Sequence, residues 1–151
     1  MLQHIDHVNL VVRDWERMTA FYADVLGLKV TKRVTIRGEW IDRVVGLAGV
    51  EADVVYLDLP AGPRIELIYY RQPASPAPEP NQANLLGLRH IAFRVADIDA
   101  VVAQLRAADT PFHSEVSTVP STQVQYAGGA QKRLVYFCDP EGNLLELCEY
   151  A

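Results

Sequence analysis

The sequence has few cysteines, no cluster of basic residues and no long apolar run. Two cysteines among 151 residues are too few for a disulfide framework. With 14 basic and 19 acidic residues, the formal net charge is −5, which disfavours nucleic acid as a partner. No apolar run approaches the roughly 20 residues that span a bilayer, and the first residues lack the pattern of an export signal. We therefore expect a cytoplasmic protein with reduced thiols and no membrane or nucleic-acid partner.

The chain contains an internal repeat. A strand-like apolar run that includes His7 is followed by Asp14, a suitable helix N-cap, and a similar run that includes His90 is followed by Asp97. Apolar residues at helical spacing follow both aspartates, and the later strand-like segments also match. Because the matches keep their order through all the elements, we interpret the chain as a duplication.

Each half predicts one strand, one helix and three further strands, which is a βαβββ module of the α+β class. We expect a single domain, 1–151, with module 1 at 1–72, a proline-rich linker at 73–84 and module 2 at 85–151. An insertion at 40–46 predicts a short helix. A module of this size buries too little to be stable alone, so the two should pair within a chain or across a homodimer, which we favour.

One histidine and one glutamate recur at matching strand positions. His7 and His90 lie in the first strand of their modules, and Glu66 and Glu146 lie in apolar runs of the last strands. A carboxylate in a half-buried strand costs energy unless it is paired or binds a cation. Singly, such a histidine is more often a core residue, and such a glutamate faces solvent. The repetition favours ligands, and imidazole with carboxylate suits Zn, Ni, Co or Mn.

These segments resemble the vicinal oxygen chelate superfamily, which includes glyoxalase I, methylmalonyl-CoA epimerase, extradiol dioxygenases and bleomycin- or fosfomycin-resistance proteins. The resemblance covers essentially the whole chain. It is carried by the residues around His7 and His90, by the run 21–28 and by the turn and strand at 139–147. It implies two tandem βαβββ modules that form a curved sheet around a shared metal-binding cavity.

The set of two histidines and two glutamates is that of glyoxalase I-like members. The resemblance implies that His7, Glu66, His90 and Glu146 hold one divalent metal ion, and that the protein is a lyase or isomerase. A small substrate with two adjacent oxygens would chelate the metal, and proton transfer would pass through a metal-bound enediolate. Analogy with the family makes Glu146 the first choice as catalytic base and Glu66 the alternative.

Alternation along the strands suggests the residues that contact the substrate. Arg94 shares a face with His90, and Asn9 shares a face with His7, so both are candidates. Arg94 could hold a carboxylate or phosphate. So could the other nearby cations, for which a solvated surface position is an equally good interpretation: Arg37, Lys132 and Arg133. The glutathione-binding arginines of glyoxalase I have no clear counterpart, so the substrate stays open.

Three other functions remain as alternatives. An epimerase of 2-substituted acyl thioesters would use the same two glutamates, although that group usually carries Gln at the position of Glu66. A binding or resistance protein would keep the cavity without turnover. A ring-cleaving dioxygenase is disfavoured because such enzymes use two histidines and one glutamate.

Overall fold

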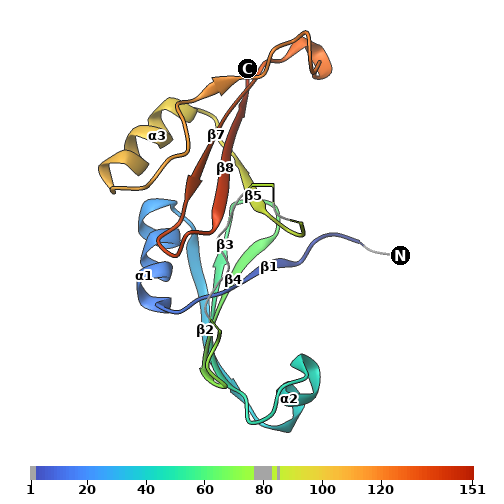
Figure 1. Ribbon diagram of the computed structural model, residues 1–151, viewed down its shortest axis with the longest axis vertical. Helices are drawn as coiled ribbons and strands as arrows, with labels where there is room; N and C mark the ends of the chain where they lie inside the picture. Colours follow the sequence, from blue (N-terminus) through green and yellow to red (C-terminus); the bar gives the residue numbers. More distant parts are fainter. Residues whose placement is uncertain (1–2, 77–82, 85) are drawn as a thin grey trace. The chain divides into compact units, whose positions relative to one another are not determined.

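The computed structural model describes residues 3–76, 83–84 and 86–151, and it contains two four-stranded sheets of mixed direction (Figure 1). The chain divides into two compact units, residues 1–78 and 79–151, which we call unit 1 and unit 2. The predicted α+β class is confirmed. The exact module boundaries stay predictions, and linker residues 77–82 lie outside the described residues.

In unit 1 the sheet has the order β1-β4-β3-β2, with β1 parallel to β4 and the other pairs antiparallel. The expected short helix is present as α2. The elements of unit 1 are β1 (His7–Val11), α1 (Trp15–Ala20), the π-helical turn η1 (Phe21–Val25), β2 (Lys29–Arg37), α2 (Glu39–Val45), β3 (Glu51–Asp58) and β4 (Arg64–Gln72).

Unit 2 repeats this topology with the order β5-β8-β7-β6, and β5 is parallel to β8. Its elements are β5 (His90–Arg94), α3 (Ile98–Ala107), β6 (Ser117–Thr118), the 3-10 turn η2 (Ala127–Gly129), β7 (Lys132–Cys138) and β8 (Leu144–Tyr150). The register is repeated as well, since Tyr56 lies opposite Glu66 and Tyr136 lies opposite Glu146. The predicted pattern of strand, helix and three strands is therefore confirmed in both units.

The two principal helices begin at the predicted caps. Asp14 accepts a hydrogen bond from the Arg17 amide at 3.1 Å, and Asp97 accepts one from the Ala100 amide at 2.9 Å. Each carboxylate satisfies an amide that has no partner within the helix. The first helix stops before Gly27, whose φ of 76° lies in the left-handed region that favours glycine. The described helices lack the length and hydropathy that crossing a membrane requires.

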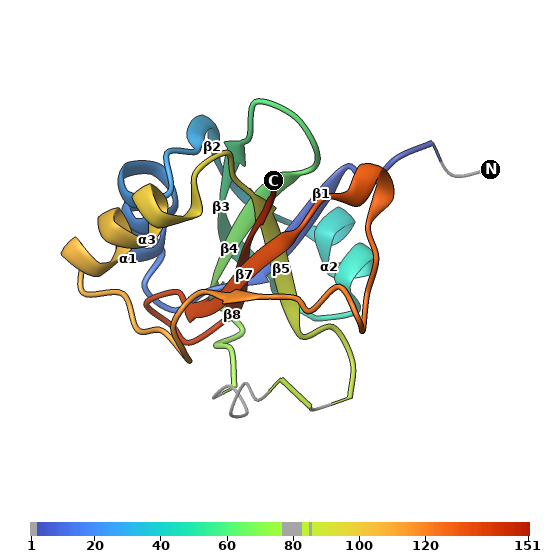
Figure 2. The same ribbon diagram turned by 90° about the horizontal axis from the view of Figure 1, so that it is seen from above.

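In unit 2, helix α3 covers one face of the sheet (Figures 1 and 2). Because side chains alternate along β8, Leu145 and Leu147 project on one face of the strand and Glu146 on the other. The fully buried residues of unit 2 include Ile98, Leu105, Phe137, Leu145 and Leu147. Glu146 lies between two of them in sequence, so its side chain projects on the opposite face. The same alternation in β4 separates Glu66 from buried Ile65 and Leu67.

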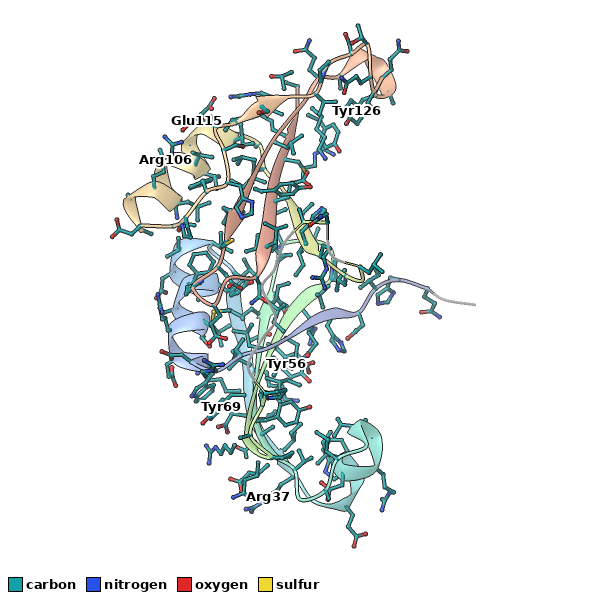
Figure 3. The ribbon with its side chains drawn as sticks, viewed as in Figure 1. Arg37, Tyr56, Tyr69, Arg106, Glu115 and Tyr126 are labelled. Carbon is teal, nitrogen blue, oxygen red and sulfur yellow. The ribbon has the colours of Figure 1, made fainter. Side chains whose placement is uncertain are left out.

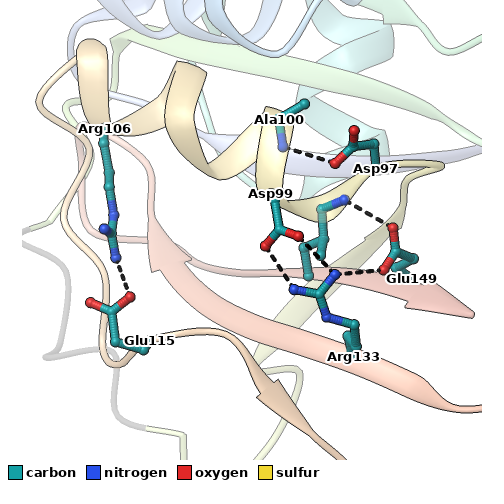
Figure 4. A network of polar contacts seen from close by, with 8 residues as sticks. Asp97, Asp99, Ala100, Arg106, Glu115, Arg133 and Glu149 are labelled. Atoms are coloured by element: carbon teal, nitrogen blue, oxygen red, sulfur yellow. Dashed lines mark hydrogen bonds and ion pairs between the residues drawn. The ribbon is translucent and has the colours of Figure 1, made fainter.

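An ion-pair network fixes the start of α3 on the sheet (Figure 4). Arg133 donates to both carboxylate oxygens of Asp99, at 2.7 and 2.9 Å, and to Glu149 at 3.1 Å. The other oxygen of Glu149 accepts a hydrogen bond from the Ile98 amide at 3.1 Å. Arg133 therefore faces the helix and serves the scaffold, not the face that carries Glu146.

The turn between β7 and β8 depends on Asp139, which is 2% exposed. Its Oδ1 accepts hydrogen bonds from the Glu141 and Asn143 amides at 3.0 and 2.9 Å, and its Oδ2 accepts one from Asn143 Nδ2 at 2.8 Å. This carboxylate sets the hairpin whose second strand carries Glu146.

We expect Asp139→Ala to lower the free energy of unfolding by about 2–3 kcal/mol, because three half-buried donors lose a buried, charged acceptor. Urea denaturation measures the change, and Asp24→Ala, at an exposed position in the η1 turn, is the control. Equal effects of the two substitutions would contradict this role of Asp139.

Candidate metal centre

In unit 1, the parallel pairing of β1 with β4 brings His7 to Glu66. Asn9 is the register partner of Glu66, and His7 lies two residues earlier on the same face. His7 Nε2 is 3.4 Å from Glu66 Oε2, and the glutamate is 8% exposed. Asn9 Nδ2 donates to the same oxygen at 2.9 Å. Asn9 thus orients the carboxylate, while its contact with substrate stays a prediction.

In unit 2, the pairing of β5 with β8 brings His90 to Glu146 in the same way. Ala92 is the register partner of Glu146, and His90 Nε2 lies 3.3 Å from Glu146 Oε2. Glu146 is 4% exposed. Its other oxygen, Oε1, lies 2.7 Å from Lys132 Nζ, at ion-pair distance but without a well-directed hydrogen bond. The two oxygens of Glu146 therefore face different partners.

The nitrogen-to-oxygen distances fit the chemistry of a shared cation. Two ligand atoms about 2.1 Å from one ion lie roughly 3.0–3.4 Å apart at ordinary coordination angles. The distances of 3.4 and 3.3 Å in the two units fall in this range. Within the described parts of the chain, no group of three or more His, Cys, Asp or Glu side chains is arranged to hold a metal ion. Each unit thus offers one imidazole nitrogen and one carboxylate oxygen.

Asp6 is a functional candidate that the sequence analysis missed. Its Oδ2 lies 2.9 Å from His7 Nδ1, and this hydrogen bond is the main cause that lowers the pKa of Asp6. A carboxylate at Nδ1 favours the tautomer in which Nε2 carries a lone pair. The Nε2 atom, 3.4 Å from Glu66 Oε2, can then bind a cation that the carboxylate also contacts. An acidic residue next to a candidate histidine was the available signal.

Tyr56 and Tyr136 lie beside the two glutamates, and neither tyrosine is among the site residues predicted from the sequence. Burial is the main cause that raises the pKa of each phenol, and the adjacent glutamate raises it further. Each phenol therefore stays protonated and can donate to its carboxylate. Tyr56 lies on β3 of unit 1 (Figure 3). Their matching positions in the repeat were the signal that could have found them.

The candidate substrate cations lie in different surroundings. Arg94 is exposed and its guanidinium lies 5.2 Å from the centre of the Tyr150 ring. Lys132 contacts Glu146, and this contact is the main cause that raises the pKa of the lysine. Arg37 ends β2 beside α2 (Figure 3). The predicted role of Arg94 in substrate binding stays a prediction.

Comparison with known proteins identifies the family. Residues 4–147 match the Glyoxalase/Bleomycin resistance protein/Dioxygenase superfamily, and the chain belongs to this family. It is 31% identical to the uncharacterized protein YaeR of Escherichia coli K12, over 98% of this chain and 97% of the relative. The crystal structure of a glyoxalase family protein from Bacillus cereus is 31% identical, with a TM-score of 0.84, over 99% of this chain and 95% of that one.

A relative with a named activity is the 2-epi-5-epi-valiolone epimerase of an Actinomyces species. It is 28% identical over 95% of this chain and 77% of the relative. The resemblance inferred from the sequence is thus confirmed at the level of the superfamily, which includes enzymes of more than one reaction type.

The Lys132–Glu146 pair should stabilise the metal-free protein. The lysine and glutamate side chains are 18% and 5% exposed, so Lys132→Met leaves a buried carboxylate without its cation. We expect a loss of about 1.5–3 kcal/mol in the free energy of unfolding, and Lys132→Met combined with Glu146→Leu should recover most of it.

The matched control is Arg33→Met, which breaks a pair with Glu16 whose side chains are 42% and 66% exposed. Surface pairs of this kind contribute about 1 kcal/mol or less. Urea denaturation after treatment with a chelator measures all the variants. A double variant that is less stable than Lys132→Met would contradict the proposed pairing.

Proposed function

We propose that the protein is a metal-dependent lyase or isomerase of glyoxalase I type, in which His7, Glu66, His90 and Glu146 hold one divalent ion. The observation that carries the proposal is the repeated His–Glu pair, with nitrogen-to-oxygen distances of 3.4 Å in unit 1 and 3.3 Å in unit 2. Two neutral imidazoles and two carboxylates would neutralise a divalent charge and suit Zn, Ni, Co or Mn. Membership of a superfamily that includes glyoxalases supports the assignment.

A bound divalent cation would polarise the adjacent oxygens of a small substrate and thereby acidify the neighbouring C–H bond. Glu146 takes up this proton and returns it, with Glu66 as the alternative base. Lys132 holds one oxygen of Glu146, while Asn9 holds Glu66. Since both carboxylates are fixed by neighbours on their own sheets, they need little rearrangement when the substrate binds.

An epimerase is the second candidate, and one observation favours it. The Actinomyces relative is named as an epimerase, and it shares 28% identity over 147 residues. Two carboxylates could remove a proton from one face of a carbon and return it to the other. For either activity we propose a homodimer that acts on a small molecule in the cytoplasm, because each unit alone offers only a small core.

The number of metal ions per chain tests whether the four ligands share one ion. We expect one divalent ion per chain, and His7→Ala or His90→Ala should each reduce the metal content strongly, because each removes one of the four ligands. His113→Ala is the control, since His113 contacts Cys138 and neither glutamate. Elemental analysis of purified protein measures the content. Retention of the full metal content by both ligand variants would contradict the shared site.

The catalytic prediction separates the base from a mere ligand. Glu146→Gln should keep much of the metal, since an amide oxygen still coordinates weakly, but it should lower kcat by about 100-fold or more. Glu66→Gln is the matched comparison.

Turnover is measured with a hemithioacetal for the lyase activity and by loss of chirality in a 2-substituted acyl thioester for the epimerase activity. Metal binding without turnover of either substrate would support a binding protein instead. Full activity in both glutamine variants would contradict a role for either glutamate as base.

A further inference from the structure

Arg94, Lys132 and Tyr150 form a cluster on the face of unit 2 that carries Glu146, and we call it the cation–tyrosine cluster. Arg94 comes from β5, Lys132 from β7 and Tyr150 from the strand between them, β8. The Arg94 guanidinium lies 5.2 Å from the centre of the Tyr150 ring, and Lys132 Nζ lies 5.8 Å from it. Tyr126 contacts the same ring edge to face, with centroids 5.3 Å apart. Two cations are thus held against one aromatic ring.

Arg94 differs from most arginines of the chain in its partners. Among the residues that the structure describes, no carboxylate is ion-paired with Arg94, whose guanidinium lies over the Tyr150 ring. Several other arginines form ion pairs with Asp or Glu. These are Arg33, Arg43, Arg64, Arg71, Arg106 and Arg133. Arg94 therefore has a guanidinium edge available for an external anion.

In unit 1 the positions that match Arg94 and Lys132 carry no cation. The register positions of Arg94 and Lys132 correspond to Val11 and Ala52, since Val11 pairs with Ile68 and Ala52 pairs with Tyr70. Ala52 belongs to a buried apolar cluster with Ile41 of α2. The repeated scaffold therefore carries apolar residues at this place in unit 1 and two cations in unit 2, which is a difference of chemistry and not of fold.

The cation–tyrosine cluster lies close enough to Glu146, the candidate base, for one small molecule to contact both. Arg94 follows Ala92, the register partner of Glu146, by two residues, which is about 7 Å along a strand. Lys132 spans the interval, because its ammonium reaches Glu146 Oε1 at 2.7 Å. A ligand group at the cluster would therefore lie within the length of a small molecule from a carbon at Glu146.

We propose that the cation–tyrosine cluster binds an oxyanion of the substrate, a carboxylate or a phosphate, two residues further along the sheet than Glu146. The planar guanidinium of Arg94 offers paired donors, Lys132 adds a second positive charge, and the Tyr150 ring holds both side chains in place. The inference rests on the proposed function and narrows its substrate to small anionic molecules with adjacent oxygens. Lys132 then links the candidate base to the anionic end of the substrate.

The test uses three probes that share a hydroxyl next to a ketone. Dihydroxyacetone phosphate carries a phosphate, 5-hydroxy-4-oxopentanoate carries a carboxylate, and the amide of the latter is neutral. Dissociation constants come from ¹⁵N-resolved NMR titration of the full chain, both zinc-loaded and chelator-treated. We expect one anionic probe to bind at least ten-fold more tightly than the amide, and comparison of the two anions distinguishes phosphate from carboxylate.

Arg94→Gln and Lys132→Gln should each reduce this preference about 10- to 100-fold, or abolish it, because each removes a charge-assisted hydrogen bond. Arg94→Lys should retain part of the preference. The matched control is Arg33→Gln, since Arg33 also lies over an aromatic ring, 5.1 Å from the centre of Trp15, but in unit 1. This control should leave the preference unchanged.

Equal binding of all three probes, or a preference that Arg94→Gln leaves intact, would overturn the anion site. Arg94 is exposed, so this variant decides the question even if Lys132→Gln fails to fold. The outcome is separable from the proposed function. Zinc binding without anion preference would overturn the inference alone, whereas an Arg94-dependent preference in a chain that binds no zinc would overturn the metal assignment alone.

Discussion

The arrangement of each unit depends on a carboxylate that is almost fully buried on its last strand. Such a group destabilises the fold unless nearby donors or cations compensate it. The compensation differs between the units: Asn9 and Tyr56 serve Glu66, while Lys132 and Tyr136 serve Glu146. In both cases a histidine from the parallel edge strand adds a nitrogen to the same polar group.

Much of the fold and the identity of the His–Glu pairs could be predicted from the sequence, because they depend on local patterns. Asp14 and Asp97 precede helical runs and cap them, and the glutamates interrupt apolar strands. Lys132 as the partner of Glu146 could not be predicted, since its side chain crosses strands diagonally and its register partner is Tyr150. Such contacts depend on strand pairing and on the reach of a long side chain.

Duplication lets one scaffold carry two kinds of chemistry. The matching register holds the His–Glu pair in the same place in each unit, so a pair of units supplies matched nitrogen and oxygen donors. The positions next to these pairs differ between the units. They are apolar around Ala52 in unit 1 and carry a cation at Lys132 in unit 2. Asp6 adds a further difference, because it contacts the ring of His7 in unit 1. Under the proposed function, the repeated residues would hold the metal and the unrepeated ones would bind the substrate.

The most direct test of the shared metal centre is anomalous X-ray scattering from crystals of the zinc-loaded protein, recorded on both sides of the zinc absorption edge. We predict one anomalous peak for each chain, within about 2.0–2.3 Å of a nitrogen or oxygen of His7, Glu66, His90 and Glu146. Separate peaks at the two His–Glu pairs, a peak beside other residues, or no peak at all would contradict the proposed shared metal centre.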